Sequence, residues 1–252
     1  MRVALLLGLA ACAQGGRDVM IDASGSDHTP DSAPPKMDAR IDAPPGTMTR
    51  ELTQTTSQTL VAQSSIACAN NPPGTSSNNY YRVFDLTAMG ITSPFVVTEV
   101  AFQVEHSDQI NGTAGSTVAV RVGTYAGTPG DVLEPSMMTI LASNPTVNVP
   151  EVIEDFGPPA TTPGGTVHAP ITATIPAGGK LLVEVDSPDG HNQYYLYMGA
   201  NKGGESAPGY VLAPTCKDSN QAFITKPTNL SKVSTTYPTV NLLLTVSGQY
   251  QP

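Results

Sequence analysis

The chain has 252 residues, of which 13% are charged, and it contains 23 glycines, 23 prolines and no tryptophan. This composition, with abundant Thr, Ser and Val, is typical of an extracellular all-β protein rather than a cytosolic enzyme. Acidic residues outnumber Lys and Arg by 21 to 12, for a formal net charge of -9. Because no basic block is present, the charge argues against nucleic acid as a partner and against electrostatic binding to anionic lipid.

The first eleven residues form a short export signal, and Cys12 follows at once. Arg2 supplies the positive charge, and the apolar core at 3–9 is too short for a span of about 20 residues. The letters LAAC at 9–12 resemble the lipobox of bacterial lipoproteins. The resemblance implies a signal peptide over 1–11, acylation of Cys12 and an anchor in the bacterial cell envelope, on the periplasmic face or the cell surface. The alternative is an ordinary secretory signal with an incidental cysteine.

Residues 12–48 combine spaced aspartates with prolines and contain the near repeats IDA at 21–23 and 41–43. No helical or strand periodicity is present, and the apolar content is too low to offset the entropy of ordering, so we expect a disordered tether. The segment resembles the Asp/Ala/Pro spacers that follow lipoboxes in some myxobacterial and related exported proteins. At a polyproline-like rise it could extend about 100 Å.

Residues 49–252 carry short apolar runs separated by Gly and Pro. Alternation puts Val100, Phe102 and Val104 on one buried side of a strand, and Val118, Val120 and Val122 repeat the pattern. No stretch has the apolar stripe of a helix. The fold class is therefore all-β, a single jelly-roll-like β-sandwich. In chain order, the expected strands cover 52–56, 59–63, 66–68, 79–86, 96–105, 117–125, 137–142, 146–149, 167–175, 180–186, 194–199 and 238–247, and the segment from 200 to 214 is expected to be a Gly-rich loop.

Four segments together are similar to a β-sandwich module that recurs in exported bacterial proteins, often beside proteases or surface adhesins. They are YYRVFDL at 80–86, VTEVAFQVE at 97–105, IPAGGKLLVEVDSPDG at 175–190 and APTC at 213–216. The similarity extends over about residues 65–248, and it implies a location and a fold but no activity.

The chain has 3 cysteines. If Cys12 is lipidated, Cys68 and Cys216 remain, and an even remainder in an exported chain predicts a disulfide between them. The loop that it closes is long, so the expected stabilisation is roughly 4–5 kcal/mol. Two free thiols, or a cysteine nucleophile, are the alternatives.

No catalytic motif stands out. GESAP at 204–208 has Pro where a nucleophile elbow needs its second Gly, and it lacks the strand-then-helix context. His106, His168 and His191 lack the spacing of known metal motifs. No phosphate cradle is present, and the acidic residues form no pair that can be assigned to glycosidase chemistry. We therefore expect no enzyme, and a hydrolase whose site is invisible in the sequence is an alternative.

Two stretches could bind a ligand. In the loop at 186–192, Asp186, Asp189 and Asn192 offer the oxygen ligands that a structural calcium needs; the alternative is a Pro-Gly turn in which Asp189 accepts turn amides. No other cofactor is expected. The second candidate is a set of tyrosines on two strands, half of which should face outward. It consists of Tyr80, Tyr81, Tyr194, Tyr195 and Tyr197.

Exposed tyrosines offer flat faces to sugars and hydroxyls to protein partners, whereas packing at the edge of the core is the alternative. The function that fits these features is that of a non-enzymatic, surface-anchored lipoprotein whose β-sandwich binds a glycan or an envelope protein. A structural or assembly subunit of an envelope complex is the second interpretation, and a hydrolase is the third.

Overall fold

A computed structural model describes residues 46–68, 73–110, 116–152, 164–214, 216, 230–233 and 239–252. They belong to the second of two units into which the chain divides, Met1–Asp42 and Ala43–Pro252. The export signal, Cys12 and the tether up to residue 45 lie outside the described residues. No helix in the described part has the length and apolarity needed to cross a membrane.

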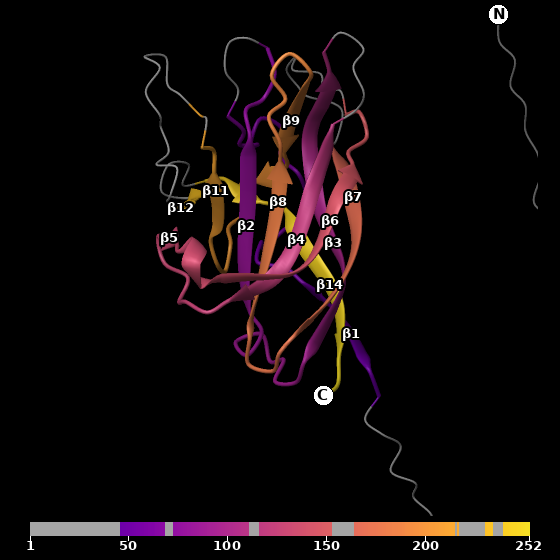
Figure 1. The fold of residues 1–252 in the computed structure, drawn as a ribbon, viewed down its shortest axis with the longest axis vertical. Coiled ribbons are helices and arrows are strands. Elements are labelled where there is room, and N and C mark those ends of the chain that lie inside the picture. Colours follow the sequence, from indigo (N-terminus) through magenta and orange to yellow (C-terminus); the bar gives the residue numbers. More distant parts are fainter. Residues whose placement is uncertain are drawn as a thin grey trace, which may run out of the picture. The chain divides into compact units, whose positions relative to one another are not determined.

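Two antiparallel sheets face each other (Figure 1). The first has the order β1 (Met48–Leu52), β14 (Leu244–Tyr250), β3 (Phe95–Gln109) and β7 (Gly165–Ile175), and β9 (Tyr194–Met198) pairs with the far end of β3. The second has the order β5 (Val132–Leu133), β12 (Leu230–Lys232), β11 (Gly209–Leu212), β2 (Asn78–Asp85), β8 (Lys180–Ser187), β4 (Thr117–Tyr125) and β6 (Met138–Asn148). A separate short pair joins β10 (Ala200–Asn201) to β13 (Asn241–Leu242).

The connections pass from sheet to sheet. The chain crosses between the sheets from β2 to β3 and again from β3 to β4, and β8 is inserted between β2 and β4 although it comes much later in sequence. Such winding is characteristic of jelly-roll sandwiches, in which hydrogen-bonded neighbours are distant along the chain. The predicted all-β sandwich is confirmed.

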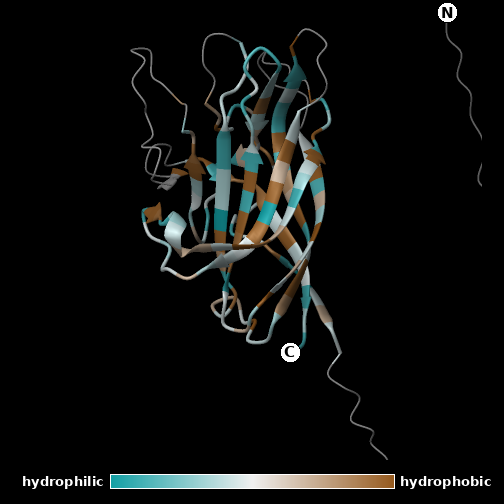
Figure 2. Cartoon of the chain, viewed as in Figure 1, coloured by the Kyte–Doolittle hydropathy of each residue, from teal (hydrophilic) through white to brown (hydrophobic). Residues whose placement is uncertain are grey.

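The core lies between the sheets and follows the alternation of the strands. Phe102 and Val104 of β3 and Val120 and Val122 of β4 are at most 2% exposed and belong to one cluster. Full burial of each such side chain stabilises the fold by about 1.5–3 kcal/mol. The same alternation is visible as brown and teal bands along the strands in Figure 2.

Several expectations for the strands were wrong. The run at 52–56 begins where β1 ends, and beyond it only Thr55 forms an isolated bridge; the run at 66–68 likewise contributes only the bridge of Ile66. The run at 59–63 is a loop and a turn, in which Gln63 adopts a positive φ of 59°. The runs at 137–142 and 146–149 form one strand, β6, because Pro145 is tolerated on the last strand of a sheet, where its missing N–H breaks no ladder. The expected loop at 200–214 contains β10 and β11, which are too short to show an alternation.

Arg82 of β2 points into the sandwich and is fully buried. Its guanidinium forms an ion pair with Glu205 at 3.1 Å and donates to the side-chain oxygen of Gln54 at 3.2 Å. It also donates to the carbonyl oxygens of Ala207 at 2.9 Å and Leu242 at 2.7 Å. Burial lowers the pKa of Arg82, and the nearby Glu205 opposes that shift. This side chain therefore ties the loop before β11 to the strands around it.

The chain enters and leaves the described domain at the same end. Met48 of β1 pairs with Tyr250 of β14, and Tyr250 in turn pairs with Phe95 at the start of β3. The other end of β3 pairs with β9, which lies at the opposite end of the domain in Figure 1.

Candidate functional site

Three of the five candidate tyrosines are buried, which corrects the predicted ligand face. Tyr80 is 1% exposed and donates its hydroxyl to the carbonyl oxygen of Ile66 at 2.6 Å. Tyr81 donates to Glu184 at 2.8 Å, and Tyr194 donates to the carbonyl oxygen of Pro188 at 3.1 Å. Burial raises the pKa of all three, that of Tyr194 to about 12. These hydroxyls stabilise the fold and stay neutral.

Tyr195 and Tyr197 remain as surface residues, on the pair formed by β3 and β9. Their neighbours along β9 are buried, so the two partly exposed rings point away from the core. The antiparallel register sets Tyr197 opposite His106 and Tyr195 opposite Asp108. Directly opposite residues share one face of a sheet. We call these four residues the β3–β9 block.

The three rings of the β3–β9 block lie in mutual contact. The rings of Tyr195 and Tyr197 are nearly parallel, with an interplanar angle of 17° and centroids 6.3 Å apart. The imidazole of His106 is tilted against both, with centroids at 6.1 Å from Tyr195 and 5.6 Å from Tyr197. The arrangement presents two roughly parallel aromatic faces beside an imidazole and a carboxylate.

The β3–β9 block contains an uncharged imidazole with acidic side chains near it. Burial lowers the pKa of His106, and Asp108 and Glu105 oppose that shift only in part. Burial, followed by the neighbouring Tyr195, raises the pKa of Tyr197. His106 is therefore uncharged at neutral pH, and the block carries no positive charge of its own.

A buried carboxylate supports the block from behind. Glu105 is 2% exposed and accepts the backbone N–H groups of Gln63 and, at 2.7 Å, of Ser65. Next along this loop, Ile66 makes an isolated bridge to Met198 at the end of β9. The loop at 63–66 is thus fixed against the strand that carries both exposed tyrosines.

The predicted calcium ligands all have partners within the chain. Asp186 forms an ion pair with Arg121 at 2.9 Å, and Asp189 contacts Nδ1 of His191 at 2.7 Å. Asn192 has a φ of 58° and donates its backbone N–H to Pro73 at 2.8 Å. Over the described ranges, no three His, Cys, Asp or Glu side chains gather as a metal site would require. The calcium site stays a prediction.

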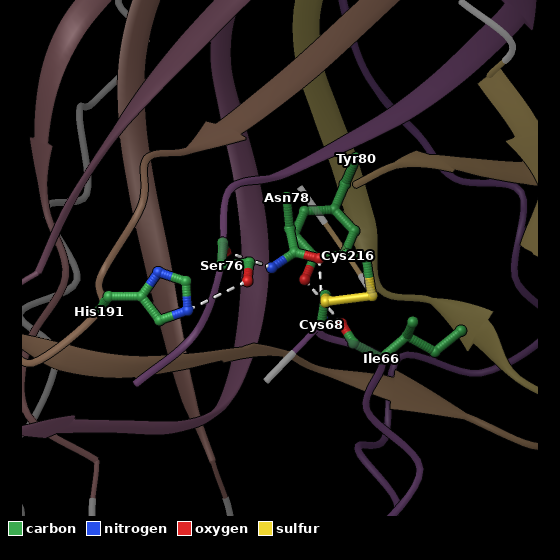
Figure 3. The surroundings of a disulfide bond; sticks show 7 residues. All are labelled: Ile66, Cys68, Ser76, Asn78, Tyr80, His191 and Cys216. Carbon is green, nitrogen blue, oxygen red and sulfur yellow. Dashed lines mark hydrogen bonds between the residues drawn. A yellow bond between two sulfur atoms is a disulfide. The ribbon is translucent and has the colours of Figure 1, made fainter. Parts of the chain in front are cut away.

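The predicted disulfide is confirmed. Cys68 and Cys216 are joined, with their Cα atoms 5.6 Å apart and a sequence separation of 148. Cys68 accepts the backbone N–H of Ser76 at 2.8 Å and donates its own N–H to the side chain of Asn78 at 2.9 Å (Figure 3). The disulfide therefore fastens the start of β2 to the segment that follows β11.

A serine, a histidine and an aspartate come together beside the disulfide, which sequence reasoning missed. Oγ of Ser76 lies 3.5 Å from Nε2 of His191, and Nδ1 of His191 lies 2.7 Å from Asp189. Figure 3 shows the first of these contacts. The order of the groups is that of a Ser-His-Asp relay. Ser76, however, is 0% exposed. No sequence motif reveals the arrangement, because the serine and the histidine lie 115 positions apart.

The fold and the block define a class of protein, an antiparallel β-sandwich with an aromatic surface cluster at one end. No family model matches the chain, and no curated protein matches it. Among solved structures, the chain is similar to the cysteine protease and lectin-like domains of Cwp84, a surface layer associated protein of Clostridium difficile. That similarity has a TM-score of 0.40 and 13% identity, and it covers 71% of this chain but 33% of the other.

Proposed function

We propose that this chain is a non-enzymatic lipoprotein of the bacterial cell envelope whose β-sandwich binds a glycan at the β3–β9 block. The observation that carries the proposal is the pair of nearly parallel, partly exposed rings of Tyr195 and Tyr197, with His106 packed against them. In this proposal the acylated Cys12 attaches the chain to the membrane, and nucleic acid is not a partner.

The chemistry of the block suits a sugar ring. A pyranose has an apolar C–H face and a rim of hydroxyls, so it can stack on an aromatic ring while its hydroxyls find donors and acceptors. Tyr195 and Tyr197 supply the rings, and their hydroxyls together with Asp108 supply the polar groups at the edge. Because the partly exposed apolar groups of the block are aromatic rings rather than aliphatic side chains, we favour a glycan over a protein partner.

The position of the block also suits display at a surface. The chain enters the domain at β1, and β9 lies at the opposite end (Figure 1). A disulfide such as Cys68–Cys216 persists in exported proteins, where the environment is oxidising.

Binding to a glycan array tests the proposal. The chain without its signal, carrying Cys12→Ser so that it stays soluble, should bind at least one glycan. Tyr195→Ala and Tyr197→Ala should each weaken that binding by about 2- to 12-fold, since one aromatic contact contributes roughly 0.5–1.5 kcal/mol. Tyr250→Ala removes a partly exposed tyrosine from the other end and should change nothing. Equal losses of glycan affinity in all three variants would contradict the assignment of the site to the β3–β9 block.

The Ser76–His191–Asp189 arrangement favours a serine hydrolase as the second candidate function. It ranks second because a nucleophile must be reached by its substrate, and Ser76 has no exposed surface. A fluorophosphonate probe distinguishes the two functions. Labelling of the wild type but not of Ser76→Ala would favour the hydrolase, and the absence of labelling would favour the binding role.

A further inference from the structure

The carboxylate of Asp108 is the part of the β3–β9 block that stacking on a sugar does not require. Asp108 is partly exposed and lies opposite Tyr195 in the register. It makes no hydrogen bond or ion pair with another described residue, in contrast to Asp186 and Asp189. A carboxylate beside exposed rings is thus available to a ligand.

We propose that the block selects glycans that carry a protonated amino group, and that Asp108 is the residue that determines this specificity. The inference rests on the proposed function, because it names the ligand class of the same site. An ammonium group on a stacked sugar would reach the carboxylate of Asp108 while lying against the face of a tyrosine ring.

Geometry favours this ligand. His106 and Asp108 are two residues apart on β3, and Tyr195 and Tyr197 are two residues apart on β9, so the four side chains form a two-by-two array on one face. Directly opposite Cβ atoms in an antiparallel pair lie about 4.5–5.5 Å apart. The distance from the carboxylate to either aromatic face is therefore no more than the width of about one sugar ring.

The charges of the block favour the same ligand. The face of an aromatic ring attracts cations, and a neighbouring carboxylate strengthens that attraction. Glu105 adds a second negative charge close to His106, and the imidazole itself is uncharged because burial lowers its pKa. The chain as a whole has a formal net charge of -9. An anionic glycan would be repelled, whereas an amino glycan would be attracted.

A matched pair of oligosaccharides provides the test. The probes are a glucosamine tetramer, whose amino groups carry a charge, and its fully N-acetylated counterpart, in which each nitrogen is an uncharged amide. Calorimetry on the mature chain with Cys12→Ser, at mildly acidic pH, should show the amino tetramer binding about tenfold more tightly. Asp108→Asn should remove this preference, because it should weaken binding of the amino tetramer more than binding of the acetylated tetramer. Glu51→Gln, on an exposed residue of β1 at the other end, should keep the preference.

The outcomes separate the inference from the function on which it rests. If the wild type binds neither tetramer nor any glycan on the array, the proposed function fails and the inference fails with it. If both tetramers bind equally, or if Asp108→Asn keeps the preference, the inference is overturned while glycan binding stands. A salt titration of the wild type is independent of any variant's folding. High salt should remove the preference, and a preference that persists in high salt would also overturn the inference.

Discussion

The disulfide lends itself to a quantitative prediction. The bond between Cys68 and Cys216 closes a loop with a sequence separation of 148 residues. In the chain-entropy model, a loop of that length restricts the unfolded state by about 5 kcal/mol at 25 °C. For a domain of this size, each kcal/mol moves the melting temperature by roughly 2–4 °C. Loss of the bond should therefore lower the melting temperature by about 10–20 °C, less whatever structure the unfolded chain retains.

The assay is thermal unfolding followed by circular dichroism on three samples: the oxidised wild type, the same protein with reductant, and the double variant Cys68→Ala/Cys216→Ala. Both cysteines are buried beside Ala213 in a small cluster of their own, so their replacement leaves little cavity in the main core. The reduced wild type and the double variant should melt together, well below the oxidised protein. A drop under about 3 °C, or two alkylatable thiols in protein purified without reductant, would refute the reasoning.

Three further predictions concern residues elsewhere in the chain. Arg82→Ala leaves Glu205, whose side chain is 12% exposed, without its cation and the surrounding acceptors without their buried donor, so chemical denaturation should show a loss of up to about 3–5 kcal/mol; an unchanged midpoint would contradict the network around Arg82. Burial lowers the pKa of His106 despite Asp108 and Glu105, so the unfolded chain binds the proton more readily. Stability should then fall as the pH drops below the ordinary histidine pKa of about 6.5, and His106→Gln should flatten that part of the melting-temperature profile. Metabolic labelling with a fatty-acid probe should mark the wild type but not Cys12→Ala, and equal labelling would end the lipoprotein interpretation.

Features encoded by local alternation could be predicted from the sequence. The alternating valines of Thr117–Tyr125 show which side faces the core, the apolar run in Lys180–Ser187 predicts a strand, and the structure places both strands inside the second sheet, away from its edges. The pairing of Cys68 with Cys216 followed from counting cysteines in an exported chain. In each case the signal lies within a few neighbouring residues or in the number of residues of one type.

Features that depend on pairing between distant strands could not be predicted. Ser76 and His191 meet because Gly190 donates its backbone N–H to Thr75 at 2.8 Å, a contact that no local pattern encodes. Arg82 has the polarity of a surface residue, but its strand position points it into the sandwich. It is accommodated there only because Glu205, Gln54 and two carbonyl groups arrive from other parts of the chain.

The direction in which the side chains of the β3–β9 block point depends on a single residue of β3. Continued alternation from Val104 would turn His106 and Asp108 toward the core. The register instead pairs Val104 with Met198 and His106 with Tyr197, so that Glu105 is an extra residue in β3. A bulge of this kind inverts the alternation beyond it. Ser107 is accordingly buried, where it shares a hydrogen bond of 2.8 Å with Ser116, whereas Asp108 after it is partly exposed. Glu105, which the alternation assigns to the solvent side, is held by the amides of the loop at 63–65. One inserted residue thus creates both the support of the block and the outward direction of the carboxylate that we assign to ligand selection.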